Sequence, residues 1–159
     1  MDLSFNEIRV LPDMSHLPQL RELFVASNKL VTITGISKLS GLKKLDLGAN
    51  RIRLIEGLDH LENLEQLWLG KNKIEKMEGL EHLNSLRILS IQSNRLVEME
   101  GMDQLTNLKE LYLSHNAIET LKNMENLVSF ILIWKGALTE ADNADHRSTL
   151  KSWTLERIK

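Results

Sequence analysis

Hydrophobic and polar positions recur along this chain with a period of 22 residues. In each unit two inward-facing apolar residues flank one polar or aromatic residue, which is the alternation of a strand with one buried face. The first inward position holds Leu23, Leu45, Leu67, Leu89 and Leu111. The second inward position holds Val25, Leu47, Leu69, Ile91 and Leu113. A fixed period of this length predicts a solenoid, in which stacked units share one continuous core.

An asparagine follows the strand in every unit. These residues are Asn6, Asn28, Asn50, Asn72, Asn94 and Asn116. The chain must turn at this point, and backbone groups there have lost their partners in the sheet. A side-chain amide carries both donors and an acceptor, so we expect the six asparagines to bond these groups and to stack as an internal ladder.

The second half of each unit contains a glycine, an apolar residue after it, and a leucine three positions further on. The glycines are Gly35, Gly57, Gly79 and Gly101. Glycine permits a tight bend, and the apolar spacing suits one 3₁₀ or helical turn. The whole unit, as in residues 64–74, is typical of a leucine-rich repeat. We therefore predict an α/β leucine-rich-repeat solenoid with a parallel β-sheet on the concave face and short 3₁₀ or helical turns on the convex face.

The repeats are expected to cover residues 1–127, as about six units of which the first is incomplete. The next asparagine would fall at position 138, where Leu138 stands. Residues 128–159 are predicted to be a degenerate C-terminal cap or tail, with a β-like start at 129–134 and a short helix through Leu150, Trp153 and Ile158. Because Met1 falls within the first strand, that strand presents an uncapped edge, which predicts self-association.

Composition narrows the class of function. The chain has 159 residues, 42% hydrophobic content and a formal net charge of −2, which suits one domain and favours neither nucleic acid nor membrane as the partner. It has no cysteine, which favours an intracellular location in the nucleus, the cytoplasm or both. No catalytic or cofactor motif is found, so we expect neither an enzyme nor a cofactor. His16, His60 and His82 share one column, but this is too few ligands to specify a metal.

The outward residue of each strand forms a column on the concave face. Its members are Asp2, Phe24, Asp46, Trp68, Ser90 and Tyr112. The next outward column is almost entirely small, so we expect the three aromatic side chains to stand above the sheet. Strands tolerate aromatics on a solvent face, but aromatic anchors with polar surroundings are typical of protein interfaces. We therefore predict a partner-binding surface formed by Asp2, Phe24, Asp46, Trp68 and Tyr112.

Residues 64–74, 91–96 and 108–116 resemble the central repeats of the protein phosphatase 1 regulatory subunit 7 family, and the likeness extends over about 1–127. The resemblance implies a regulatory scaffold whose acidic and aromatic concave residues contact the catalytic subunit of the type-1 serine/threonine phosphatase. It maps that role onto Asp2, Phe24, Asp46 and Trp68. The family continues with further repeats where this chain departs, so Trp134 is left out of the surface. The alternative is an adaptor for another intracellular partner, similar to the axonemal dynein light chain or a spliceosomal subunit.

Overall fold

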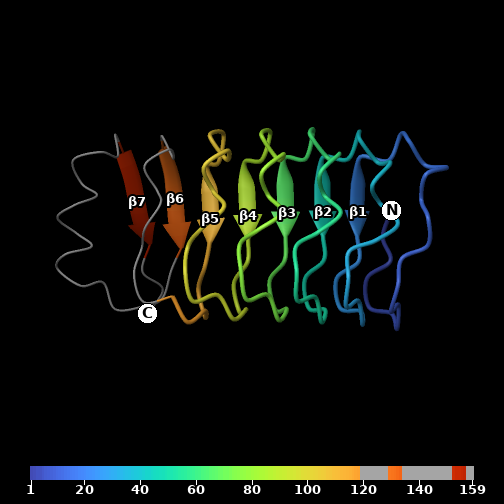
Figure 1. The fold of residues 1–159 in the computed structure, drawn as a ribbon, viewed down its shortest axis with the longest axis horizontal. Coiled ribbons are helices and arrows are strands. Elements are labelled where there is room, and N and C mark those ends of the chain that lie inside the picture. The colour runs from blue at the N-terminus through green and yellow to red at the C-terminus, as the bar shows by residue number, and fades with distance from the viewer. Residues whose placement is uncertain (119–128, 134–151, 157–159) are drawn as a thin grey trace.

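The computed structural model describes residues 1–118, 129–133 and 152–156, with the side chains of the last two segments excluded. These residues contain seven strands: β1 (Glu22–Phe24), β2 (Lys44–Asp46), β3 (Gln66–Trp68), β4 (Ile88–Ser90), β5 (Glu110–Tyr112), β6 (Ser129–Ile133) and β7 (Ser152–Glu156). They form one sheet in chain order, and every neighbouring pair is parallel (Figure 1). The predicted leucine-rich-repeat solenoid with a parallel sheet is confirmed.

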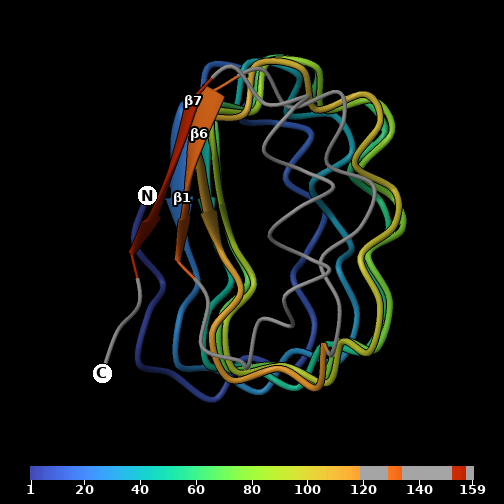
Figure 2. The ribbon, with the colours of Figure 1, turned by 90° about the vertical axis from the view of Figure 1, so that its left-hand side faces the viewer.

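The core lies between the sheet and the segments that connect its strands. Figure 2 looks along the stack and shows the strands on one side of a loop that the connecting segments close. Leu45 pairs with Leu67 across β2 and β3, and both side chains are fully buried. Because each unit buries only a few side chains, its stability depends on the neighbours that cover its two open sides.

Among the described residues, the connecting segments on the back of the sheet contain no helix. The expected 3₁₀ turns are present as single turns, two in succession in each connecting segment. The amide of Leu61 donates to the carbonyl of Leu58 at 2.9 Å, and the amide of Leu64 donates to that of Leu61 at 2.9 Å. In a continuous helix such a bond would start at every residue, but here one starts only at every third residue. The chain therefore changes direction at each turn, and each leucine points inward.

The repeated glycines are needed where each unit bends against the one before it. Gly79 has φ +71°, and a Cβ atom built on it would lie 2.2 Å from the carbonyl oxygen of Ile55. Gly101 makes the same close approach to Met77, at 2.1 Å. A side chain is therefore excluded both by the backbone conformation and by the packing of adjacent repeats.

The sheet continues past residue 127. Leu132 in β6 pairs with Leu111, an offset of 21 residues, and Leu155 in β7 pairs with Leu132, an offset of 23. The expected β-like start is observed as β6, but the predicted helix is wrong at Trp153, which lies in strand β7. Leu150 and Ile158 lie outside the described residues. The shorter offset also puts Ile133, rather than Trp134, opposite Tyr112.

Candidate functional site

The strand register places the predicted surface residues in one row across the sheet. Phe24 pairs with Asp46, Asp46 with Trp68, Trp68 with Ser90, and Ser90 with Tyr112. Asp2 adds to this row through an isolated parallel bridge to Phe24. In strands β1 to β5 the leucine before each row residue is buried in the core, so alternation sends these side chains to the outer face of the sheet.

Two aromatic rings of this row contact each other. The centroids of Trp68 and Tyr112 are 6.0 Å apart, with 33° between the ring planes. Their strands are separated by β4, so the two side chains must lean toward each other over Ser90, which is only 2% exposed. Tyr112 also donates its hydroxyl hydrogen to Glu110 Oε2 at 2.8 Å. The rings of Trp68 and Tyr112 therefore form one contacting pair on the outer face.

The indole nitrogen of Trp68 is buried and has no hydrogen-bond partner among the described residues. The residue as a whole is half-buried. A shielded donor without an acceptor is unfavourable, because the bond it made to water in the unfolded chain is not replaced. The Trp68 indole N–H is therefore a polar group of the aromatic pair that makes no hydrogen bond to the described residues.

Phe24 lies at the other end of the row and has a cationic neighbour. The Lys44 Nζ atom sits 5.2 Å from the centre of the Phe24 ring, within the range of a cation–π contact. Lys44 stands two residues before Asp46 on the same side of β2. The aromatic surface is accordingly divided into two parts, Phe24 with Lys44 and Trp68 with Tyr112, with Asp46 between them.

The two carboxylates of the row help to organise the chain after each strand. Asp46 Oδ1 accepts a hydrogen bond from the backbone amide of Gly48 at 2.9 Å, and Asp2 Oδ1 accepts one from the amide of Ser4 at 2.9 Å. The bonds from Ser4 lower the pKa of Asp2 below its ordinary value. Both residues therefore have a local structural role in addition to any contact with a partner.

The asparagine column bonds each repeat to its predecessor. Asn72 Nδ2 donates to the carbonyl of Leu69 in its own repeat and to that of Leu47 in the preceding one, both at 3.0 Å. Asn72 Oδ1 accepts from the amide of Ile52, also in the preceding repeat, at 3.0 Å. The same three bonds are made by Asn28, Asn50, Asn94 and Asn116. Asn6 is exposed and bonds only the carbonyls of Leu3 and Ser4.

Some residues of the outer face were not identified from the sequence. Lys44 and Glu110 occupy the outward position two residues before the predicted row. Lys44 contacts the Phe24 ring, and Glu110 accepts the hydroxyl hydrogen of Tyr112. The side chain of Gln92 lies against Gly70, where a Cβ atom would come 3.2 Å from Gln92 Cγ. The two-residue alternation that identified the row could also have identified the column of Lys44 and Glu110, whereas Gln92 belongs to the next outward column already found from the sequence.

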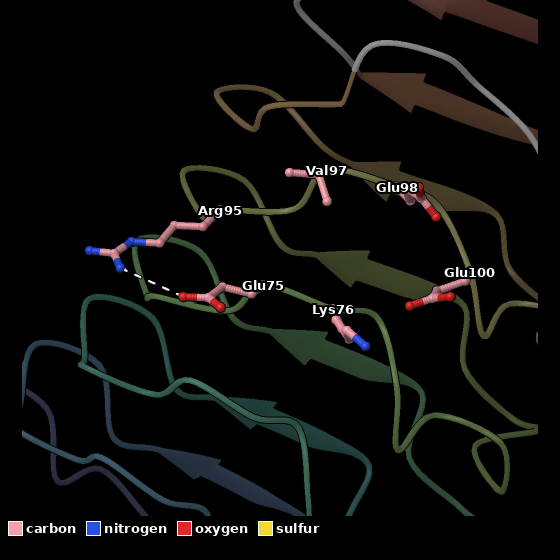
Figure 3. A pocket seen from close by; sticks show the side chains of 6 residues that line it. All are labelled: Glu75, Lys76, Arg95, Val97, Glu98 and Glu100. Carbon is pink, nitrogen blue, oxygen red and sulfur yellow. Dashed lines mark ion pairs between the residues drawn. The ribbon is translucent and has the colours of Figure 1, made fainter.

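A separate pocket of about 520 Å³ lies away from the aromatic row (Figure 3). It is lined by Glu75, Lys76, Arg95, Val97, Glu98 and Glu100, which belong to the segments that follow Asn72 and Asn94. Arg95 and Glu75 form an ion pair at 3.8 Å. Its lining mixes both signs of charge with one aliphatic side chain, and it contains none of the predicted surface residues. We therefore base the functional argument on the outer face of the sheet.

Two further features bear on the class of function. Among residues 1–118 and the two later strands, no group of three or more potential metal ligands is found, and His16, His60 and His82 are exposed. In the same part of the chain, no helical segment has the length and apolar character required to cross a bilayer.

Comparison with known proteins gives a consistent family. A family model described as leucine-rich repeat matches residues 37–146. A search of curated proteins gives no match. A solved leucine-rich-repeat protein of Leptospira interrogans is 30% identical, with a TM-score of 0.73, over 82% of this chain and 36% of that one.

Two internalins of Listeria monocytogenes are also similar in structure. Internalin C2 is 25% identical, with a TM-score of 0.76, over 95% of this chain and 68% of its own. Internalin F is 20% identical, with a TM-score of 0.74, over 96% of this chain and 52% of its own. The chain therefore spans about half of internalin F and about a third of the Leptospira protein.

Proposed function

The chain belongs to the leucine-rich-repeat family, whose domains generally bind proteins and are typically not catalytic, and on this premise we propose that it is a regulatory scaffold for the type-1 serine/threonine phosphatase catalytic subunit. The binding surface in this proposal is the outer face of the sheet. Such a phosphatase acts inside the cell, in the nucleus or the cytoplasm, which agrees with the cysteine-free sequence.

The observation that carries the proposal is the row of aromatic side chains on an open sheet. Trp68, Tyr112 and Phe24 are each half-buried and lie in register across five strands. Large aromatic residues that are partly covered in the free protein and clustered on one face are typical anchors of protein interfaces. The small residues beside them, Gly48 and Gly70, leave room for a partner to approach the rings.

The choice of partner rests on the resemblance of residues 64–74, 91–96 and 108–116 to the phosphatase regulatory family. That resemblance assigns contacts to Asp2, Phe24, Asp46 and Trp68, all of which lie in the observed row. Tyr112 enters the proposed surface through its contact with Trp68. A leucine-rich-repeat adaptor for a different intracellular protein would use the same face, so the partner is the part of the proposal that needs direct measurement.

The test is a titration of the recombinant chain against the purified phosphatase catalytic subunit. We expect Trp68→Ala to weaken binding by about thirtyfold, because truncating a central aromatic anchor commonly costs about 2 kcal/mol. Phe24→Ala should have a similar or smaller effect. Asp46→Ala should have a smaller effect that depends on salt, since charges at the rim mainly change the association rate.

His60→Ala is the control, because His60 is exposed on the back of the solenoid. Circular dichroism verifies that each variant keeps its fold. No binding by the parent chain would exclude the phosphatase and favour the adaptor alternative. If binding is lost in His60→Ala but kept in Trp68→Ala, the partner contacts the back of the solenoid and the proposed surface is wrong.

A further inference from the structure

Charge is segregated around the solenoid although the net charge is only −2. Two columns that border the ends of the strands are mostly basic, and two columns on the back are mostly acidic. The column just before the strands holds Arg21, Lys43, Arg87 and Lys109, interrupted by Glu65. The column just after the asparagines holds Lys29, Arg51, Lys73 and Arg95. Columns on the back hold Glu56, Glu78, Glu100, Asp59, Glu81 and Asp103, all of them exposed.

Three of these basic side chains and Lys71 surround the aromatic pair without an ion-pair partner among the described residues. Arg87 and Lys109 immediately precede β4 and β5, and Lys71 and Lys73 follow β3 at the opposite end of the strands. Lys71, Arg87 and Lys109 are exposed, and Lys73 is half-buried. Adjacent strands lie ~5 Å apart, so these cations border one compact surface centred on the two rings.

The carboxylates closest to this surface are already engaged. Glu65 accepts a hydrogen bond from Lys43 Nζ at 2.8 Å, and this bond lowers the pKa of Glu65. Glu110 accepts the hydroxyl hydrogen of Tyr112. Asp46 and Glu110 stand beside the rings without an ion pair among the described residues, and the four cations outnumber them. The surface around the rings therefore keeps an excess of positive charge, which would attract a partner of the opposite sign.

We propose that the Trp68–Tyr112 pair and the cations Lys71, Lys73, Arg87 and Lys109 form a recognition site for an acidic segment of a partner protein that carries an apolar side chain. This inference rests on the proposed binding function of the outer face and specifies the chemistry of what is bound. The apolar side chain covers the rings, and the flanking carboxylates meet the four cations.

A single-stranded nucleic acid is the other polyanion that combines with aromatic rings and cations. The protein segment is favoured here because Asp46 and Glu110 stand on the same face and would repel a continuous phosphate backbone. A protein segment can place its carboxylates away from them. The absence of a net basic charge points in the same direction.

The test measures fluorescence anisotropy of a labelled short peptide of aspartate and glutamate residues with one central leucine. Matched probes replace the leucine by serine, or the acids by lysine and arginine, and a labelled oligothymidylate represents nucleic acid. We expect the acidic leucine peptide to bind best, with an affinity that falls as salt is raised. A quadruple variant replaces the four cations by glutamine: Lys71→Gln, Lys73→Gln, Arg87→Gln and Lys109→Gln. This variant should bind the acidic leucine peptide about tenfold more weakly, and its affinity should depend less on salt.

The charge-matched control is Arg9→Gln, Lys38→Gln, Arg53→Gln, Lys76→Gln, which removes the same number of cations from exposed positions outside the aromatic surface. It should bind the acidic peptide like the parent chain. Equal losses in the two quadruple variants, unchanged binding in Trp68→Ala, or absence of acidic-peptide binding by the parent would each overturn the inference. Tighter binding of oligothymidylate that also depends on Trp68 would assign the surface to nucleic acid instead.

Parallel titrations with the phosphatase catalytic subunit separate this inference from the proposed function. Binding of the catalytic subunit that depends on Trp68, without binding of the acidic peptide, would leave the scaffold function intact and reject the acidic segment. Binding of the acidic peptide without binding of the catalytic subunit would support the recognition site and reject the phosphatase as partner.

Discussion

Trp68 and Tyr112 contact each other across an intervening strand, with their ring centroids 6.0 Å apart. The contact is possible because the residue between them, Ser90, is small, and it is only 2% exposed. One side of the Trp68 ring is therefore already occupied by the protein's own chain. A partner meets the joined surface of two rings rather than an isolated indole.

We expect Trp68→Phe to leave the free energy of unfolding unchanged within about 1 kcal/mol, or to raise it. The substitution keeps an aromatic ring above Ser90 but removes the indole N–H, whose burial without an acceptor costs roughly 1–3 kcal/mol. Trp68→Ala should lower the free energy by about 1–2 kcal/mol, since ring contact and buried area are both lost. Urea unfolding of the two variants provides the measurement. If Trp68→Phe and Trp68→Ala lower the free energy of unfolding equally, the buried N–H does not destabilise the fold.

Removal of a central asparagine should destabilise the repeats strongly. Asn72→Ala removes the bonds to the amide of Ile52 and to the carbonyls of Leu47 and Leu69. The two carbonyls keep Asn50 and Asn94 as donors, whereas the buried Ile52 amide loses its side-chain acceptor. We expect a loss of about 1–3 kcal/mol in the free energy of unfolding, because a buried donor is left unpaired.

Two controls accompany this variant. Lys73→Ala alters a neighbouring surface residue and should change the free energy very little. Asn6→Ala should also cost less than Asn72→Ala, because Asn6 is exposed and bonds only its own repeat. If the three variants have the same melting temperature, the asparagine ladder has no structural role.

The bend glycines should not accept a side chain, whereas glycines of the outer face should. Gly79→Ala puts a Cβ atom 2.2 Å from the Ile55 carbonyl oxygen at a φ of +71°, so we expect a cost of about 2 kcal/mol or more. In Gly70→Ala the closest atom is Gln92 Cγ at 3.2 Å, which belongs to a side chain that can shift. Its cost should stay below about 1 kcal/mol. A reversed order of the two melting temperatures would refute the packing seen between repeats.

The Lys43–Glu65 pair should make stability depend on pH in the acid range. The hydrogen bond from Lys43 lowers the pKa of Glu65 below its ordinary value of 4.5. The unfolded state then binds protons more readily than the folded state, so the contribution is present above pH 4.5 and disappears as the pH falls through the lowered value. In Glu65→Gln this part of the acid destabilisation should be missing. The effect is small because the pair is exposed to solvent.

Urea unfolding at a series of pH values checks this expectation. Glu62→Gln is the control, since Glu62 is exposed and has no ion pair among the described residues. The curve for Glu65→Gln should flatten between neutral and acid pH relative to that control. Identical slopes for both variants would mean that the pair contributes nothing measurable to folding.

The sequence was sufficient to predict the strands because one column repeats without interruption. Leu23, Leu45 and Leu67 mark the same inward position, and a parallel register follows directly from their equal spacing. Residues outside that period were predicted less well. Trp153 was assigned to a helix because an apolar pair at helical spacing surrounds it, whereas pairing with β6 favours a strand.

The surface was predicted at the level of position but not of side-chain direction. Alternation indicates that Trp68 and Tyr112 point outward, yet it contains no information on rotamers, so their contact over Ser90 was not predicted. The hydrogen bond of Asp46 to Gly48 was missed for a related reason. The repeat pattern shows which residues are equivalent, but it does not show which side chains bond a backbone amide two residues later in the same repeat.

The backward bonding of the asparagines also bears on how such a chain can change in length. Asn94 bonds the carbonyl of Leu69, and if residues 51–72 were deleted, Asn94 would meet the equivalent carbonyl of Leu47 in the same geometry. Insertion or loss of a whole unit thus preserves every bond, while a change of one residue within a unit would misalign an amide with its acceptors. Offsets of 21 and 23 residues occur in the described strands only after Asn116, the last asparagine of the column. The ladder therefore favours insertions and deletions of whole repeats. Duplication of a gene segment that encodes one repeat can lengthen the protein while the buried positions and the ladder bonds stay the same.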